Sequence, residues 1–254
     1  MFTVEERDRI RDRILAMAHA DPRIAAGAMI GSLAGEPGDR WSDLDLGFGV
    51  GVGASPAEVL AGWTPRLERE HDAVHLFDLT SASTVYRVFL FPGALQVDLS
   101  FAPAGEFGAR GPKFKLLFGS AVEHPRTEPP SPSHLFGLGV HHAVRARFCV
   151  ERGRIWQAQH WISEMREIGL TLACRRRGLE TRQGRGYDGL PAEVLTPFED
   201  TLVRSLDRSE LLRALGGVID GLLREADEAR VLASRVEGQL RALASAGFAQ
   251  ESPR

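Results

Sequence analysis

The sequence predicts an α/β (α+β) domain with a small mixed sheet, followed by an all-α helical bundle. Up to residue 122, apolar stretches of strand length alternate with segments of helical periodicity. Residues 123–132 then hold four prolines, which neither a helix interior nor a central strand tolerates. Beyond them only long helical patterns continue. We therefore predict domains at 1–122 and 133–245, joined by a linker at 123–132 and followed by a flexible tail at 246–254.

Composition narrows the class of protein. The 254 residues are 43% hydrophobic, enough to bury a large core in one or two domains. The formal net charge of −3 gives no basic surface for a long nucleic acid, so small substrates are expected. Cys149 and Cys174 show neither metal-ligand spacing nor a disulfide framework, and the charged N-terminus is neither a secretory signal nor a membrane span. These features predict a cytoplasmic protein; a homodimer is one open alternative for its assembly.

The elements of the first domain follow from capping signals and from apolar periodicity. Residues 3–6 have the form of a capping box, which opens a helix to about residue 19. The next elements are predicted, in order, as a strand at 24–30, a strand at 43–50, a capped helix at 55–70, a strand at 74–79, a hairpin of 84–91 and 95–101, and an edge strand at 113–119.

The second domain is predicted as four helices. Two long ones cover residues 133–151 and 154–177. Thr196 to Glu199 has the form of a cap that opens a short third helix. A long fourth helix then runs from 207 to 245, with a kink allowed at Gly216-Gly217.

The stretch from Gly31 to Asp45 carries the chemistry. In a strand that begins at Asp43, side chains alternate, so Asp43 and Asp45 leave one face together. Crowded carboxylates repel each other unless a cation lies between them, and hard oxygen ligands suit Mg²⁺ or Mn²⁺. The turn at Gly31-Ser32 lets the backbone approach a phosphate closely. The alternative is that Gly31-Ser32 is an ordinary turn and that Asp43 and Asp45 lie on the solvent face of an edge strand.

Asp98 is a third carboxylate of interest. In the strand at 95–101, apolar residues share one face, while Gln96, Asp98 and Ser100 share the other. A carboxylate at the centre of a good core strand asks for an explanation. The explanation without a functional role is that this strand has one solvated face.

Gly31-Ser32, followed after a loop by Asp43-Leu44-Asp45 on a strand, resembles the signature of the DNA polymerase β-like nucleotidyltransferase superfamily. The resemblance implies that Asp43 and Asp45 are metal ligands and that Gly31 and Ser32 cradle phosphates. It also implies a third acidic residue on a neighbouring strand, for which Asp98 is the candidate, as a metal ligand or as the catalytic base. Lys113 and Lys115 are candidates to neutralise nucleotide phosphates, or ordinary protection of an edge strand.

The order of a small α/β domain and a helical bundle is similar to that of the aminoglycoside and lincosamide nucleotidyltransferases. In such relatives the helical domain helps to bind the acceptor and supplies a catalytic carboxylate. Glu164 is the first candidate for that catalytic role, with Glu151, Glu167 and Asp188 behind it.

The resemblance therefore implies a metal-dependent nucleotidyltransferase. It would transfer a nucleoside monophosphate, AMP from ATP, to a hydroxyl of a small molecule such as an antibiotic, and release pyrophosphate. Two alternatives stay open: a non-catalytic regulatory protein of the same fold, such as an antitoxin, and transfer of the nucleotide to a protein or tRNA. The negative net charge weighs against tRNA.

Overall fold

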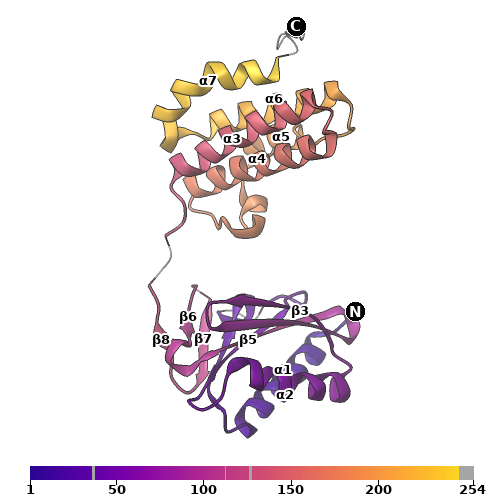
Figure 1. Ribbon diagram of the computed structural model, residues 1–254, viewed down its shortest axis with the longest axis vertical. Helices are drawn as coiled ribbons and strands as arrows, with labels where there is room; N and C mark the ends of the chain where they lie inside the picture. The colour runs from indigo at the N-terminus through magenta and orange to yellow at the C-terminus, as the bar shows by residue number, and fades with distance from the viewer. Residues whose placement is uncertain (36–37, 112, 126–127, 246–254) are drawn as a thin grey trace. The chain divides into compact units, whose positions relative to one another are not determined.

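The computed structural model describes residues 1–35, 38–111, 113–125 and 128–245 (Figure 1). The chain divides into two compact units, Met1–Thr127 and Glu128–Arg254. The tail expected at 246–254 and residues 126–127 of the expected linker lie outside the described residues.

The first unit is a six-stranded mixed sheet, ordered β3-β4-β5-β2-β1-β7, with α1 and α2 packed against it. β2 and β5 run parallel, and the other neighbouring strands of this sheet run antiparallel. The elements are α1 (Val4–Ala20), β1 (Ile24–Ile30), β2 (Leu44–Val50), α2 (Pro56–His71), β3 (Val74–Ser81), β4 (Thr84–Phe91), β5 (Leu95–Pro103) and β7 (Phe114–Phe118). A separate short pair joins β6 (Gly108–Ala109) to β8 (Val122–Glu123). The predicted fold class of this domain is confirmed.

Local sequence sets the helix ends of this unit. The Thr3 hydroxyl accepts a hydrogen bond from the Glu6 N–H, and the Glu6 carboxylate accepts one from the Thr3 N–H. Ser55 and Glu58 form the same reciprocal cap at α2. Each capping box satisfies N–H groups that a helix start otherwise leaves unpaired.

Because side chains alternate along β2 and β5, each strand has an apolar face that packs against the helices and a polar face on the other side. The apolar face carries Leu44, Leu46 and Phe48 of β2, all fully buried. It continues on β5 and packs in one core with apolar residues of α1 and α2. The face opposite the helices carries Asp45 and Asp98.

The junction between the units differs in detail from the predicted linker. Glu123 lies in β8, and Pro132 is already the first residue of α3. Proline suits that position because the first N–H of a helix has no partner to lose.

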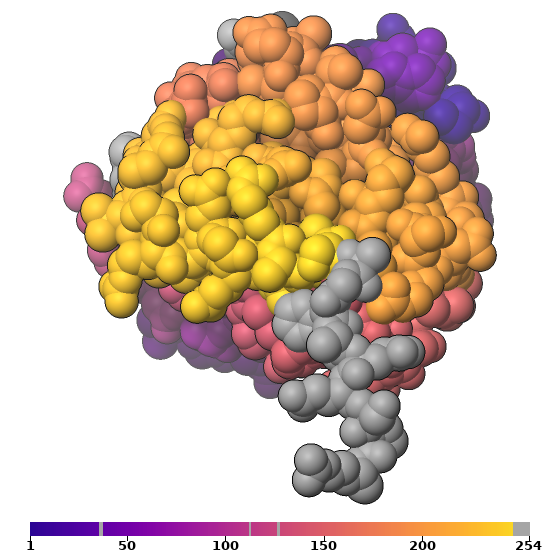
Figure 2. Space-filling model, turned by 90° about the horizontal axis from the view of Figure 1, so that it is seen from above, coloured from indigo at the N-terminus to yellow at the C-terminus, as the bar shows by residue number. Residues whose placement is uncertain are grey.

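The second unit is all α-helical, as predicted. Its helices are α3 (Pro132–Glu151), α4 (Ile155–Arg176), α5 (Ala192–Glu199), α6 (Arg208–Arg224) and α7 (Arg230–Ala244). The apolar sides of α3, α4, α6 and α7 share one main core, in which Cys149 is buried. Figure 2 shows α7 beside α6 on the surface of this unit. Cys149 and Cys174 are both buried and unbridged.

The expected cap at Thr196 was wrong, because α5 already begins at Ala192. Pro191 accepts the first helical hydrogen bonds, from Val194 and Leu195. Val194 and Phe198, one turn apart, pack into a small core with α4. This tertiary packing outweighs the local cap signal at 196.

The single long helix expected at 207–245 was also wrong. The first helix, α6, ends at Arg224, and a second helix, α7, begins at Arg230. The predicted kink site, Gly216-Gly217, lies inside α6. A Cβ on Gly217 would come within 3.1 Å of Thr201, so this glycine permits close packing. Glu225 lies at the end of α6 and is 4% exposed, and its carboxylate contacts Arg177 at 3.0 Å. This long-range ion pair with the residue after α4 anchors Glu225 at the break and has no local sequence signal.

Within the part of the chain that the structure describes, no helix is long and apolar enough to span a bilayer.

Candidate metal and nucleotide site

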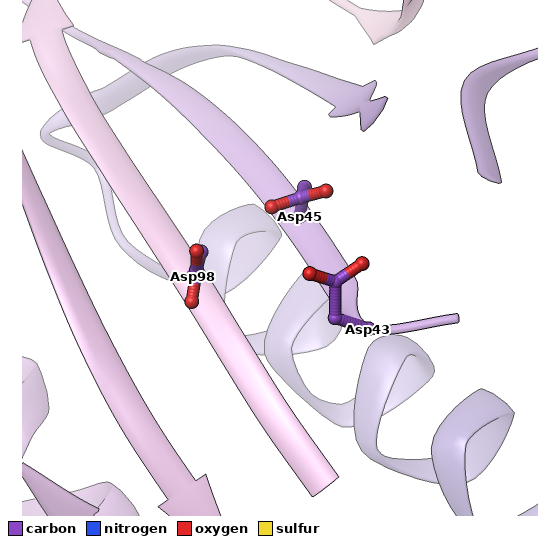
Figure 3. A group of neighbouring side chains, drawn as sticks. All are labelled: Asp43, Asp45 and Asp98. Carbon is purple, nitrogen blue, oxygen red and sulfur yellow. The ribbon is translucent and has the colours of Figure 1, made fainter. Parts of the chain in front are cut away.

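Two parallel strands bring the three predicted carboxylates together. Asp45 of β2 and Asp98 of β5 are register partners, so their side chains leave the sheet on the same face. Asp43 precedes β2 and lies two residues before Asp45. Figure 3 shows the three side chains grouped beside these strands. Carboxylate oxygens of all three lie within 4.8 Å of one another.

This geometry fits a divalent cation. Two oxygens on opposite sides of one Mg²⁺ ion lie roughly 4.2 Å apart, given metal–oxygen distances of about 2.1 Å. The observed spacing therefore reaches an Mg²⁺ ion with small side-chain shifts. Carboxylate oxygens are also the donors that Mg²⁺ and Mn²⁺ prefer.

The surroundings of Asp98 disfavour its ionised form. Burial raises the pKa of this carboxyl above its ordinary value, and the negative charge of Asp43 acts in the same direction. A hydrogen bond of 3.0 Å from the Gln96 amide opposes the rise in pKa. A cation beside Asp98 would relieve both unfavourable effects.

Gly31 lies directly against Asp45. Its φ of +71° is in the left-handed region, and a Cβ on this residue would lie 2.0 Å from the Asp45 Oδ2 atom. Only glycine fits this position without displacing the carboxylate. The Gly31 N–H donates to the carbonyl of Lys113 at 3.2 Å, so this N–H group is already paired.

Ser32 lies in a short 3₁₀ helix, Gly31–Ala34, at the predicted turn. Its hydroxyl oxygen is buried and has no hydrogen-bond partner among the described residues. Buried hydroxyl groups in native proteins are usually paired, so an unpaired one beside an acidic cluster is consistent with a missing ligand.

Lys113 and Lys115 occupy the β7 edge of the sheet. Both are exposed, and Lys113 touches the Gly31 turn through its backbone carbonyl. Lys115 is the register partner of Met29, whose side chain belongs to the core under the helices. Alternation therefore places Lys115 on the face opposite Asp45.

The candidate bases of the second unit differ in their surroundings. Glu164 is partly buried on α4, and its charge acts on His142. Glu151 contacts Arg147 and Arg208, each at 2.6 Å, and the Arg208 contact lowers the pKa of the Glu151 carboxyl. Such ion pairing makes Glu151 a weak proton acceptor. Glu167 and Asp188 are exposed.

Gln96 is a site residue that the sequence analysis did not single out. It lies two positions before Asp98 in the same strand, so alternation alone places it on the carboxylate face. The spacing of two residues from Asp98 was therefore a sequence signal that could have identified Gln96. Its hydrogen bond to the Asp98 Oδ1 atom fixes the orientation of this carboxyl group.

Comparisons with known proteins give little beyond this geometry. No protein-family model matches the chain, and no curated protein matches it. Among solved structures, the chain is similar to an aminoglycoside 6-adenyltransferase from Bacillus subtilis, with 13% identity over 96% of this chain and 99% of that chain. The TM-score is 0.37.

Proposed function

We propose that the protein is a metal-dependent nucleotidyltransferase that moves a nucleoside monophosphate, AMP from ATP, to a hydroxyl of a small molecule. The observation that carries the proposal is the cluster of Asp43, Asp45 and Asp98, with carboxylate oxygens within 4.8 Å of one another. The Ser32 hydroxyl, buried without a partner among the described residues, and the close approach of Gly31 to Asp45 form the second part of the site.

Each carboxylate has a role in this proposal. Asp43 and Asp45 hold Mg²⁺ or Mn²⁺, which would neutralise the triphosphate and align it for attack. Asp98 completes the cluster as a further metal ligand or as the base. Ser32 donates its hydroxyl to a β- or γ-phosphate oxygen, and Gly31 leaves room for the chain to approach it.

The two lysines contribute unequally in this scheme. Lys113 lies beside the Gly31 turn through its backbone carbonyl, so it is the first of the two candidates to neutralise the outer phosphates. Lys115 must reach them around the sheet edge from the opposite face.

The reaction is a displacement at the α-phosphorus. The acceptor oxygen forms a bond to this phosphorus, and the bond from the phosphorus to the bridging oxygen of the β-phosphate breaks. Pyrophosphate leaves with the electrons of that bond. The hydroxyl proton passes to a carboxylate, either Asp98 or Glu164, and the protein's main contribution is positioning and charge stabilisation.

The binding step is tested by calorimetry with ATP and with a non-hydrolysable analogue, in Mg²⁺ or in EDTA. We expect binding in Mg²⁺ only, and its loss in Asp45→Asn. Asp12→Asn is the matched control, because Asp12 is exposed on α1 outside the cluster. Equal binding of ATP in EDTA would contradict the proposal.

Turnover is tested with labelled ATP and separate pools of metabolites, antibiotics, proteins and RNA as acceptors. We expect label transfer to a small molecule and stoichiometric pyrophosphate. Label on protein or RNA would contradict a small-molecule acceptor. Metal-dependent ATP binding without transfer to any pool would favour a regulatory protein of this fold.

A further inference from the structure

A second polar cluster lies between α3 and α4, within the second unit. α3 contributes His141, His142 and Arg145, and α4 contributes His160, Trp161 and Glu164. Residues three or four positions apart share one side of each helix, whereas the adjacent pairs His141-His142 and His160-Trp161 diverge by about 100°. The rings of His142 and Trp161 meet across the two helices, with centroids 4.8 Å apart.

Two buried polar atoms of this cluster lack a hydrogen bond. His142 is 6% exposed, yet no described residue bonds to its Nδ1 atom. The same holds for Trp161 Nε1, which is always a donor. Two buried polar atoms without a partner among the described residues, on one pair of contacting rings tilted by 44°, are unusual in a native interior and point to a partner that the protein itself does not supply.

An exposed pair of side chains covers these two rings. The Arg145 guanidinium lies over the indole ring of Trp161, 5.3 Å from its centroid. Its Nε atom donates to His141 Nε2 at 2.8 Å. Both residues are exposed, so water can replace this bond when Arg145 moves aside. Rotation of Arg145 would open the ring pair to a ligand.

The charges around the ring pair select the chemistry of that ligand. Glu164 offers only acceptors, whereas the indole N–H offers only a donor. A hydroxyl group satisfies both, because it donates and accepts. An ammonium group can donate to Glu164 but has no lone pair to accept from the indole N–H. A carboxylate group is repelled by Glu164.

We propose that the α3–α4 cluster binds an uncharged polyhydroxyl compound, with Trp161 donating to one hydroxyl and Glu164 accepting from another. Under the proposed function, on which this identification depends, the bound compound is the acceptor. The binding itself requires neither nucleotide nor metal.

The test uses the full chain in EDTA and three sugars on the same pyranose ring: glucose, glucosamine and glucuronate. The indole N–H resonance of Trp161, assigned with Trp161→Phe, reports binding by NMR. We expect glucose to shift it in a saturable way, and glucosamine and glucuronate to bind at least tenfold more weakly. A glucosamine affinity equal to or above that of glucose would overturn the proposal, and so would a resonance that none of the sugars moves.

Two variants separate this site from others on the same helix. Glu164→Gln replaces a charge-assisted hydrogen bond with a neutral one, so we expect roughly tenfold weaker glucose binding. Trp156→Phe should leave binding unchanged, because Trp156 is 73% exposed and lies outside the cluster. Unchanged binding in Glu164→Gln would contradict the proposal even if Trp161→Phe failed to fold. Glucose binding without ATP binding would refute only the proposed nucleotidyl transfer.

Discussion

Asp45 and Asp98 are direct register partners on the parallel strands β2 and β5, although they lie more than fifty positions apart in the chain. Because side chains alternate, a slip of either strand by one residue would move its carboxylate to the face covered by α1 and α2. The register that buries Leu46 and Leu99 is therefore the same register that assembles the acidic cluster. Core packing and site geometry are fixed together.

The first prediction concerns the cost of this cluster without metal. The folded-state pKa of Asp98 is raised, so its contribution to stability is present at low pH and is lost as pH rises through that pKa. In EDTA, Asp98→Asn should therefore be more stable than the wild type, with a difference that grows between acidic and neutral pH. Urea unfolding at several pH values measures it. The exposed control Asp12→Asn should show no such growth.

Added Mg²⁺ should reverse this order. A cation that binds the folded state raises its free energy of unfolding, and Asp98→Asn should gain less than the wild type. An equal gain in both proteins would show that Asp98 does not contribute to metal binding.

The second prediction concerns Gly31→Ala. An alanine Cβ would be strained at a φ of +71° and would collide with the Asp45 carboxylate. We expect a loss of roughly 1–3 kcal/mol in the free energy of unfolding, together with weaker nucleotide binding. Gly178→Ala is the matched control, because its φ is +69° and nothing lies within 4 Å of the added Cβ. Equal destabilisation of the two variants would mean that strain alone acts at Gly31.

The faces of Asp45 and Asp98 were predictable because alternation within a strand is local. Alternation around Asp45 and Asp98 assigns each to a face, and one shared set of helices makes the two faces coincide. The face of Lys115 was less predictable, since it depends on which residue of β1 it opposes. Register between strands that are distant in sequence is set by packing, not by local composition.

The second unit shows the same limit more clearly. At the helix break after Arg224, Glu225 meets Arg177, the residue after α4, in a pairing across 48 positions. The contact of His142 with Trp161 likewise requires the two helices to be docked. Periodicity assigns a residue to one side of a helix, but it does not identify the residue on the facing helix.

The third prediction concerns Asp21, which joins α1 to β1. Hydrogen bonds from Arg23 and Trp63 hold the pKa of this carboxyl far below its usual value. A lowered folded-state pKa gives stability that is present above the unfolded pKa of about 3.9 and is lost as pH falls below it. Asp21→Asn should lower the free energy of unfolding by about 1–3 kcal/mol at pH 7, because hydrogen bonds to a charged group are lost.

Measured at progressively lower pH, this difference between the wild type and Asp21→Asn should shrink. Asp12→Asn serves again as the exposed control, and its stability should follow that of the wild type. A difference that stays constant from neutral pH to pH 3 would exclude the ionised Asp21 carboxylate as its source.

The last prediction uses Ser32→Ala to separate binding from stability. The Ser32 hydroxyl is buried without a described partner, so its removal costs the empty protein no hydrogen bond and should leave the free energy of unfolding unchanged or slightly higher. If the hydroxyl donates to a phosphate oxygen, ATP affinity in Mg²⁺ should fall roughly tenfold. Ser100→Ala is the control on the same sheet face, because the Ser100 hydroxyl already donates to the Leu46 carbonyl at 3.4 Å. Its removal should affect stability at most and leave ATP affinity intact. Equal ATP affinity in wild type and Ser32→Ala would remove Ser32 from the nucleotide site, and the unpaired hydroxyl would then need a bound water as its partner.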